Sequence, residues 1–252
     1  MEQQKLEFLT KTAANIRLGI HEAVHAASSG HPGGSLSIAD IMTYLYFSEM
    51  KVDANDPKWE GRDRLVLSKG HTAPALYSAL AEKGFFDKSA LKTLRQADSF
   101  LQGHPDMKGT PGVDMSTGSL GLGVSAACGM ALAAKIDRKD YRTYAIVGDG
   151  ESQEGQIWEA LMLAAQKGHA DVVRLLVQAG ADANIRDASQ RTAMQHATTD
   201  AIRQLLTQQP PTSAAAKQGA TLHQAIKDGT LDYEHPLLNA REKLNERDGS
   251  GL

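Results

Sequence analysis

Short apolar runs that end in glycine-rich loops constrain the first part of this chain more than any other feature. Leu65-Val66-Leu67 leads into Ser68-Lys69-Gly70-His71, and Tyr144-Ala145-Ile146-Val147 leads into Gly148-Asp149-Gly150. Apolar residues recur at helical spacing at about 8–27 and 35–48, and in stretches that end near Leu80 and Ala134. A Ser-, Gly- and Pro-rich cluster at 28–34 predicts a loop between the first two helices. Alternating strands and helices predict an α/β fold with a parallel sheet.

Polar groups follow the expected strands at their carboxyl ends, where parallel sheets collect ligands. His71, Asp149 and the glycine loop 117–123 are therefore expected at one edge of the sheet. Gly148 and Gly150 allow a tight turn, so the Asp149 carboxylate can project as an oxygen ligand for Mg²⁺ or Ca²⁺. Each signal alone also fits an ordinary turn or a structural histidine. Their combination favours a binding site.

Composition excludes several classes of function. The formal net charge is -3 and spreads over both halves, so no basic face for nucleic acid is expected. The sequence has no apolar leader and no run near the roughly 20 apolar residues of a membrane helix, which predicts a cytoplasmic protein without a membrane partner. The single Cys128 lies among alanines and glycine, which indicates a buried helix thiol rather than a nucleophile.

Five motifs together resemble a known family. They are, in order, Ser29-Gly30-His31-Pro32-Gly33-Gly34, Ser68-Lys69-Gly70-His71, Gly103-His104-Pro105, Thr117-Gly118-Ser119-Leu120-Gly121 and Gly148-Asp149-Gly150-Glu151-Ser152-Gln153-Glu154-Gly155. Their order and spacing resemble the amino-terminal, diphosphate-binding half of transketolases, especially the form that is split into two subunits. The resemblance covers residues 8–158, and we take 1–158 as a truncated domain of this type.

This resemblance implies thiamine diphosphate and Mg²⁺ as cofactors and transfer of a two-carbon ketol unit between sugars. By similarity, Asp149 between Gly148 and Gly150 is the metal ligand, His71 contacts the diphosphate, and the loop from Gly118 to Leu120 holds the aminopyrimidine. His31 and His104 are implied to face the sugar, because imidazoles exchange protons near neutral pH. Glu154 resembles an acidic residue near the subunit contact. Together His31, His71, His104 and Glu154 form the implied catalytic set.

The resemblance breaks after the metal loop. The family places a second metal ligand, an asparagine, about 30 residues after the aspartate, where this chain has Ala179, and the nearest alternative is Asn184. Mg²⁺ demands near-octahedral oxygen coordination, so cofactor binding is expected to be weak or lost. The pyrimidine-binding domain of the family is also missing, and a carboxyl-terminal transketolase subunit could supply it as a partner.

Residues 159–252 follow a different pattern, since 12 of the 13 aromatic residues lie at or before Trp158. The segment from Glu159 to Asn184 resembles an ankyrin repeat, with helices on either side of Gly168 and a cap at Gly180, and parts of it recur 33 and 61 residues later. We expect an all-α tail of degenerate repeats at 159–187, 188–207 and 219–252, with a linker at 208–218. Such repeats bind protein ligands.

Three hypotheses follow from the joined patterns. The chain is a transketolase-like fragment that is inactive alone, an ankyrin-like interaction module on a non-catalytic scaffold, or a chimera without function. Both parent patterns use a small-residue helix at 158–165, so one continuous helix is expected to cross the junction. Because the helix no longer leads into a further strand, the edge of the sheet is expected to be partly exposed.

Overall fold

The computed structural model describes residues 3–178 and 181–207. The chain divides into two compact units, residues 1–209 and 210–252, and the described residues all belong to the first. Ala179, Gly180, the linker at 208–218 and the expected third repeat at 219–252 lie outside the described residues.

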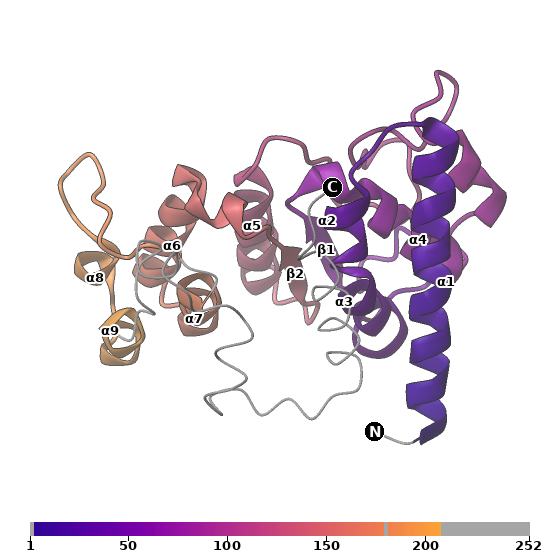
Figure 1. Cartoon of the computed structure of the whole chain (residues 1–252). Coiled ribbons are helices and arrows are strands. Elements are labelled where there is room, and N and C mark those ends of the chain that lie inside the picture. Colours follow the sequence, from indigo (N-terminus) through magenta and orange to yellow (C-terminus); the bar gives the residue numbers. More distant parts are fainter. Residues whose placement is uncertain (1–2, 179–180, 208–252) are drawn as a thin grey trace. The chain divides into compact units, whose positions relative to one another are not determined.

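Helices dominate the described residues (Figure 1). In chain order the elements are α1 (Gln3–Ala27), α2 (Pro32–Leu36), α3 (Ala39–Tyr44), η1 (Leu45–Glu49), β1 (Arg64–Leu67), η2 (Gly70–Thr72), α4 (Ala73–Lys83), η3 (Lys88–Thr93), α5 (Leu122–Ile136), β2 (Thr143–Ile146), η4 (Gly150–Gln153), α6 (Gly155–Lys167), α7 (Ala170–Gln178), α8 (Ala193–His196) and α9 (Asp200–Thr207). Within this part of the chain no helix combines the length and the apolar character that a membrane span needs.

The two strands form the expected parallel sheet. β1 pairs with β2 in a register that runs from Arg64 opposite Thr143 to Leu67 opposite Ile146. The crossover between them contains α4 and α5, and α5 packs against both strands (Figure 1). The sheet is therefore a small α/β unit whose two carboxyl ends point to the same side.

The outer strand is partly exposed, in agreement with the expectation. The apolar side chains of β1 are buried, whereas Ala145 in β2 is exposed. On the neighbouring α5, Leu122 is 53% exposed and Ile136 is 71% exposed. Within the described residues, β2 has β1 as its one strand neighbour.

The helical prediction for the segment after α1 was partly wrong. Pro32, which was expected in a loop, opens the short helix α2, because proline fits the first helical turn, where its missing N–H leaves no bond unmade. The expected single helix at 35–48 is divided into α2, α3 and the π-helical turn η1. Gly34 lies within α2, and its carbonyl oxygen accepts hydrogen bonds from Ser37 Oγ and Lys69 Nζ.

Two hydrophobic clusters stabilise the described residues. The first surrounds α1, α3, α4 and β1, and its largest fully buried members include Ile16, Ile20, Met42, Tyr46, Tyr77 and Leu80. The second joins α5 to the helices that follow and includes Val124, Ile157, Leu161, Val173 and Ile202. At roughly 25 cal/mol per Å² of buried apolar surface, these clusters supply the main favourable term in folding.

The helix α6 crosses the predicted junction at 158/159 without a break, as expected. It ends at Gly168, whose φ of 80° is left-handed, and this confirms the predicted turn. α6 then packs against α7 and α8, and α7 packs against α9. The described part of the tail is therefore helical, although α8 is only one turn long, and its assignment to a repeat family stays a prediction.

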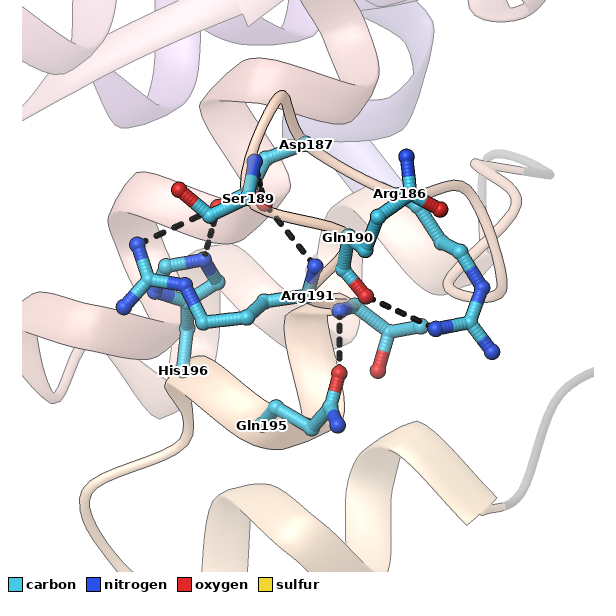
Figure 2. Close-up of polar contacts among 8 residues, drawn as sticks. Arg186, Asp187, Ser189, Gln190, Arg191, Gln195 and His196 are labelled. Atoms are coloured by element: carbon cyan, nitrogen blue, oxygen red, sulfur yellow. Dashed lines mark hydrogen bonds and ion pairs between the residues drawn. The ribbon is translucent and has the colours of Figure 1, made fainter.

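The loop before α8 is organised around one carboxylate (Figure 2). Asp187 accepts hydrogen bonds from the backbone N–H of Ser189 at 2.8 Å and of Arg191 at 2.9 Å, and from His196 Nε2 at 2.8 Å. The Arg191 N–H contributes most to lowering the pKa of Asp187 to about 2, and His196 and Ser189 contribute further. The turn forces Gln190 to a left-handed φ of 62°.

Gln190→Gly is expected to raise the free energy of unfolding by about 1 kcal/mol, because glycine adopts a left-handed conformation without a steric penalty. Urea denaturation measures the change. The matched control is Gln166→Gly in the exposed face of α6, which should lower stability by about 1 kcal/mol. Equal losses of stability in the two variants would show that the left-handed backbone of Gln190 is not strained.

Gly123→Ala is expected to lower the free energy of unfolding by about 1–3 kcal/mol, because overpacking forces backbone shifts. A Cβ at Gly123 would lie 2.6 Å from both Cα and Oγ of Ser68, where α5 crosses the end of β1. In the same helix a Cβ at Gly129 would meet nothing within 4 Å, so Gly129→Ala should stabilise the protein by about 0.5–1 kcal/mol. Thermal unfolding of both variants gives the comparison, and a stable Gly123→Ala would show that the contact can relax.

Candidate functional site

The loop after β1 lies against the loop of Thr117 and against the short helix α2. Thr117 Oγ1 donates a hydrogen bond to the Leu67 carbonyl oxygen at 2.7 Å, and a Cβ at Gly70 would lie 2.9 Å from the Thr117 backbone. Lys69 Nζ donates to the Gly34 carbonyl oxygen at 3.2 Å. Segments that are far apart in the sequence therefore meet at the carboxyl end of β1, where the parallel sheet predicts a site.

Three of the predicted site histidines gather at this place. The rings of His31 and His71 meet edge to face, with centroids 5.0 Å apart. Burial lowers the pKa of His71 below its usual 6.5, and the charges of His31, Lys69 and His104 lower it further against the opposing effect of Glu151. His71 is thus held in its neutral form at neutral pH.

The loop that carries His104 is fixed by a buried tyrosine. The Tyr77 hydroxyl lies 2.9 Å from the carbonyl oxygens of both Gln102 and His104, and burial raises the pKa of this phenol. A Cβ at Gly118 would lie 3.8 Å from the His104 ring, so the predicted loop from Gly118 to Leu120 begins beside this imidazole. The structure therefore brings together His31, His71, His104 and Gly118.

The predicted metal loop follows β2 and lies beside the loop of β1. A Cβ at Gly148 would lie 3.7 Å from Lys69 Cδ. The Asp149 side chain is exposed, while its carbonyl oxygen accepts hydrogen bonds from Ser152 N and Oγ. In residues 3–178 and 181–207 no group of three or more His, Cys, Asp or Glu side chains could hold a metal ion. Asp149 is thus an exposed carboxylate that belongs to no such group in these residues.

The nearest alternative for a second metal ligand is bound within a different loop. Position 179 lies outside the described residues. Asn184 belongs to the loop after α7, where its side-chain amide donates to Asp182 Oδ1 at 3.1 Å. Glu154 occupies the N-cap of α6 and is exposed, and its Cβ lies 3.1 Å from where a Cβ of Gly121 would be.

Sequence reasoning missed Glu151, the carboxylate that connects these loops. Its side chain is 2% exposed. Oε1 accepts hydrogen bonds from Ser68 Oγ at 2.5 Å and from the Gly121 N–H at 2.8 Å, and Oε2 accepts from the Gly148 N–H at 2.9 Å. Glu151 belongs to the motif after β2, but no periodicity in that motif indicates which of its two glutamates turns inward.

Cys128 lies on α5, half-buried rather than fully buried as expected. Burial raises the pKa of its thiol, which keeps it protonated and poorly nucleophilic at neutral pH. This agrees with the expected structural role.

Comparisons with known proteins identify the family of this chain. Residues 9–228 match the family described as transketolase, thiamine diphosphate binding domain. The chain is 52% identical over 164 residues to 6-deoxy-6-sulfo-D-fructose transketolase subunit SqwG of Clostridium sp. (strain MSTE9). The aligned residues cover 65% of this chain and 59% of that protein. It is 44% identical over 162 residues to one of the subunits of the apulose-4-phosphate transketolase of Phocaeicola vulgatus, covering 64% of this chain and 57% of that protein.

Solved structures support the same placement. The transketolase of Campylobacter jejuni superposes with a TM-score of 0.60 at 40% sequence identity, over 66% of this chain and 27% of that one. The chain thus spans less than two thirds of the length of each of these relatives. The match to the family covers most of the sequence, including all five motifs. The chain belongs to the family of transketolase thiamine diphosphate binding domains.

Proposed function

We propose that this chain is the thiamine diphosphate-binding part of a split-subunit, transketolase-like enzyme. The observation that carries the proposal is the convergence of His31, His71 and His104 with Lys69 at the carboxyl ends of the parallel strands. When bound, thiamine diphosphate supplies the carbanion chemistry of two-carbon ketol transfer. The residues of the chain bind and orient that group.

The donors at this site fit an anionic group. Imidazole and ammonium groups come from His71 and Lys69, and a Cβ at Gly33 or Gly150 would meet nothing within 4 Å, so there is open space beside the backbone at these two positions. In our proposal these groups hold the diphosphate, and the loop from Gly118 to Leu120 holds the aminopyrimidine. His31 and His104 hydrogen-bond to sugar hydroxyls and move protons there.

The fit to a divalent cation is only partial. Asp149 offers a carboxylate oxygen for Mg²⁺, or for the less demanding Ca²⁺, beside the diphosphate donors. In the described residues it is not joined by two further ligands of the usual kinds. Water can complete the coordination, but each missing protein ligand lowers the affinity for the metal and the cofactor. We therefore propose weak cofactor binding and no activity of the chain alone.

A second polypeptide is part of the proposal. Two relatives are described as transketolase subunits, and their similarity covers 65% and 64% of this chain. A carboxyl-terminal subunit would supply the pyrimidine-binding domain. Glu154, exposed beside the loop of Gly121, is accessible to such a partner.

One observation favours a second candidate function, the binding of a protein ligand by ankyrin-like repeats. The helix pair α6–α7 stacks on the pair α8–α9, and Thr198 Oγ1 donates to the carbonyl oxygen of Ala165, which lies 33 positions earlier. Thr192 and Gln195 form a capping box at the start of α8. In this alternative the front domain is a scaffold or a chimeric remnant, and cofactor binding is absent.

Isothermal titration calorimetry with thiamine diphosphate and Mg²⁺ separates the two candidates. We expect binding by the intact chain, and a loss of about tenfold or more in Asp149→Ala, because a charge-assisted metal contact is removed. Asp137→Ala, at the exposed carboxyl end of α5, is the matched control and should bind as the wild type does. Absence of binding by the wild-type chain would refute the first candidate.

The lowered pKa of His71 predicts a pH dependence of stability. Between the folded-state pKa of His71 and 6.5, the unfolded chain binds more protons than the folded one. The contribution of neutral His71 to the free energy of unfolding is therefore intact above pH 6.5, and it is lost as the pH falls through the folded-state pKa. Urea denaturation from pH 5 to 8 should show a steeper acid loss in the wild type than in His71→Gln. His25→Gln, at an exposed position of α1, is the control and should keep the wild-type slope.

A further inference from the structure

We propose that Glu151 is a positioning residue that sets the spacing between the loops of the cofactor site. This inference rests on the proposed function, because it assigns a task to Glu151 only if the loops bind one ligand. Ser68 belongs to the loop of the implied diphosphate contact, Gly121 ends the implied aminopyrimidine loop, and Gly148 precedes the implied metal ligand. One buried side chain thus bonds to all three loops.

The geometry requires a carboxylate at this position. The two backbone N–H groups bind different oxygens, since Gly121 donates to Oε1 and Gly148 donates to Oε2. Both groups are obligatory donors, so an amide in place of the carboxylate would turn its NH₂ group against one of them in either orientation. A buried donor without an acceptor costs about 1–3 kcal/mol. Glutamine therefore cannot hold both loops.

The loops also pack too closely to be adjusted independently. The first turn of α5 packs against the residue that follows β1, so that a Cβ at Gly123 would clash with Ser68. Ser68 and Gly121 lie 83 and 30 residues from Glu151 in the sequence, so these bonds fix tertiary rather than local structure. Without the carboxylate, the Gly121 N–H loses its bond to Glu151 and the end of the aminopyrimidine loop can shift, while the bond from Thr117 to Leu67 still holds the start of that loop.

A buried carboxylate at the opposite end of the strands provides a matched control. Asp63 is 2% exposed, like Glu151, and accepts hydrogen bonds from the backbone N–H of Lys51 and of Arg142, each at 2.8 Å. It also bonds separate segments through two different oxygens, but it precedes β1 and lies away from the loops of the site. Asp63→Asn therefore reproduces the structural loss without the positioning loss.

The experiment compares two ligands by calorimetry in the presence of Mg²⁺, well below the unfolding temperature. Inorganic pyrophosphate needs only the diphosphate and metal loops, whereas thiamine diphosphate needs all three. In Glu151→Gln we expect the Kd for thiamine diphosphate to rise about tenfold or more, with a much smaller change for pyrophosphate. In Asp63→Asn the ratio of the two Kd values should equal that of the wild type.

The two readouts separate positioning from general destabilisation. A purely structural role would change both Kd values by the same factor, because both ligands lose the same fraction of folded protein. If the wild type binds both ligands and Glu151→Gln leaves the ratio of the two Kd values unchanged, this inference is overturned and the proposed function is not. A wild-type chain that binds neither ligand overturns the proposed function, and this inference with it. If Glu151→Gln does not fold, Glu151→Asp keeps a carboxylate near Gly148 but shortens its reach to the Gly121 N–H, so it should shift the ratio in the same direction, and an unchanged ratio there overturns the inference.

Discussion

The pairing of β1 with β2 sets the edge at which the candidate site forms. Four residues of each strand form a parallel ladder, so both strands end on the same side. The loops of His71 and Asp149 become neighbours although 78 positions separate them in the sequence. The crossover adds the loops of His104 and Gly118 at the same edge. A ladder this short depends on α5 and the first hydrophobic cluster, which hold β1 buried.

The sequence predicted the parts that depend on local pattern. The strands follow from apolar runs, the turn at Gly168 from glycine, and the place of His71 from the strand that precedes it. That His31 and His104 belong to the same site was implied only by the resemblance to transketolases. Pro32 was placed wrongly because proline both breaks helices and begins them, and only the surrounding packing decides between the two. Glu151 was missed because its role consists of long-range bonds, which leave no periodicity in the sequence. The roles of the site residues, the Mg²⁺ and the cytoplasmic location stay predictions.

The region after Trp158 shows a different limit of sequence reasoning. Its helices and their turn were predicted correctly, since helical spacing and capping residues are local signals. Membership in a repeat family is a statement about how successive units stack, and it depends on residues beyond 207 as well as on those described. The match to the transketolase domain extends to residue 228 and so overlaps the segments expected to be repeats.

The helix α6 contacts both α5, beside the candidate site, and the helices α7 and α8 that follow it. At the start of α6, Gln156 Oε1 accepts a hydrogen bond from Ser125 Oγ on α5 at 2.8 Å. The Cβ of Gln156 lies 3.0 Å from where a Cβ of Gly121 would be. Nine positions later, the carbonyl oxygen of Ala165 accepts a hydrogen bond from Thr198 Oγ1. α6 is continuous between these points, and its backbone hydrogen bonds leave little freedom for the two ends to move separately. The residues that contact the loop of Gly121 and the residue that binds the segment after α8 thus belong to one uninterrupted helix, so both regions share a single structural support.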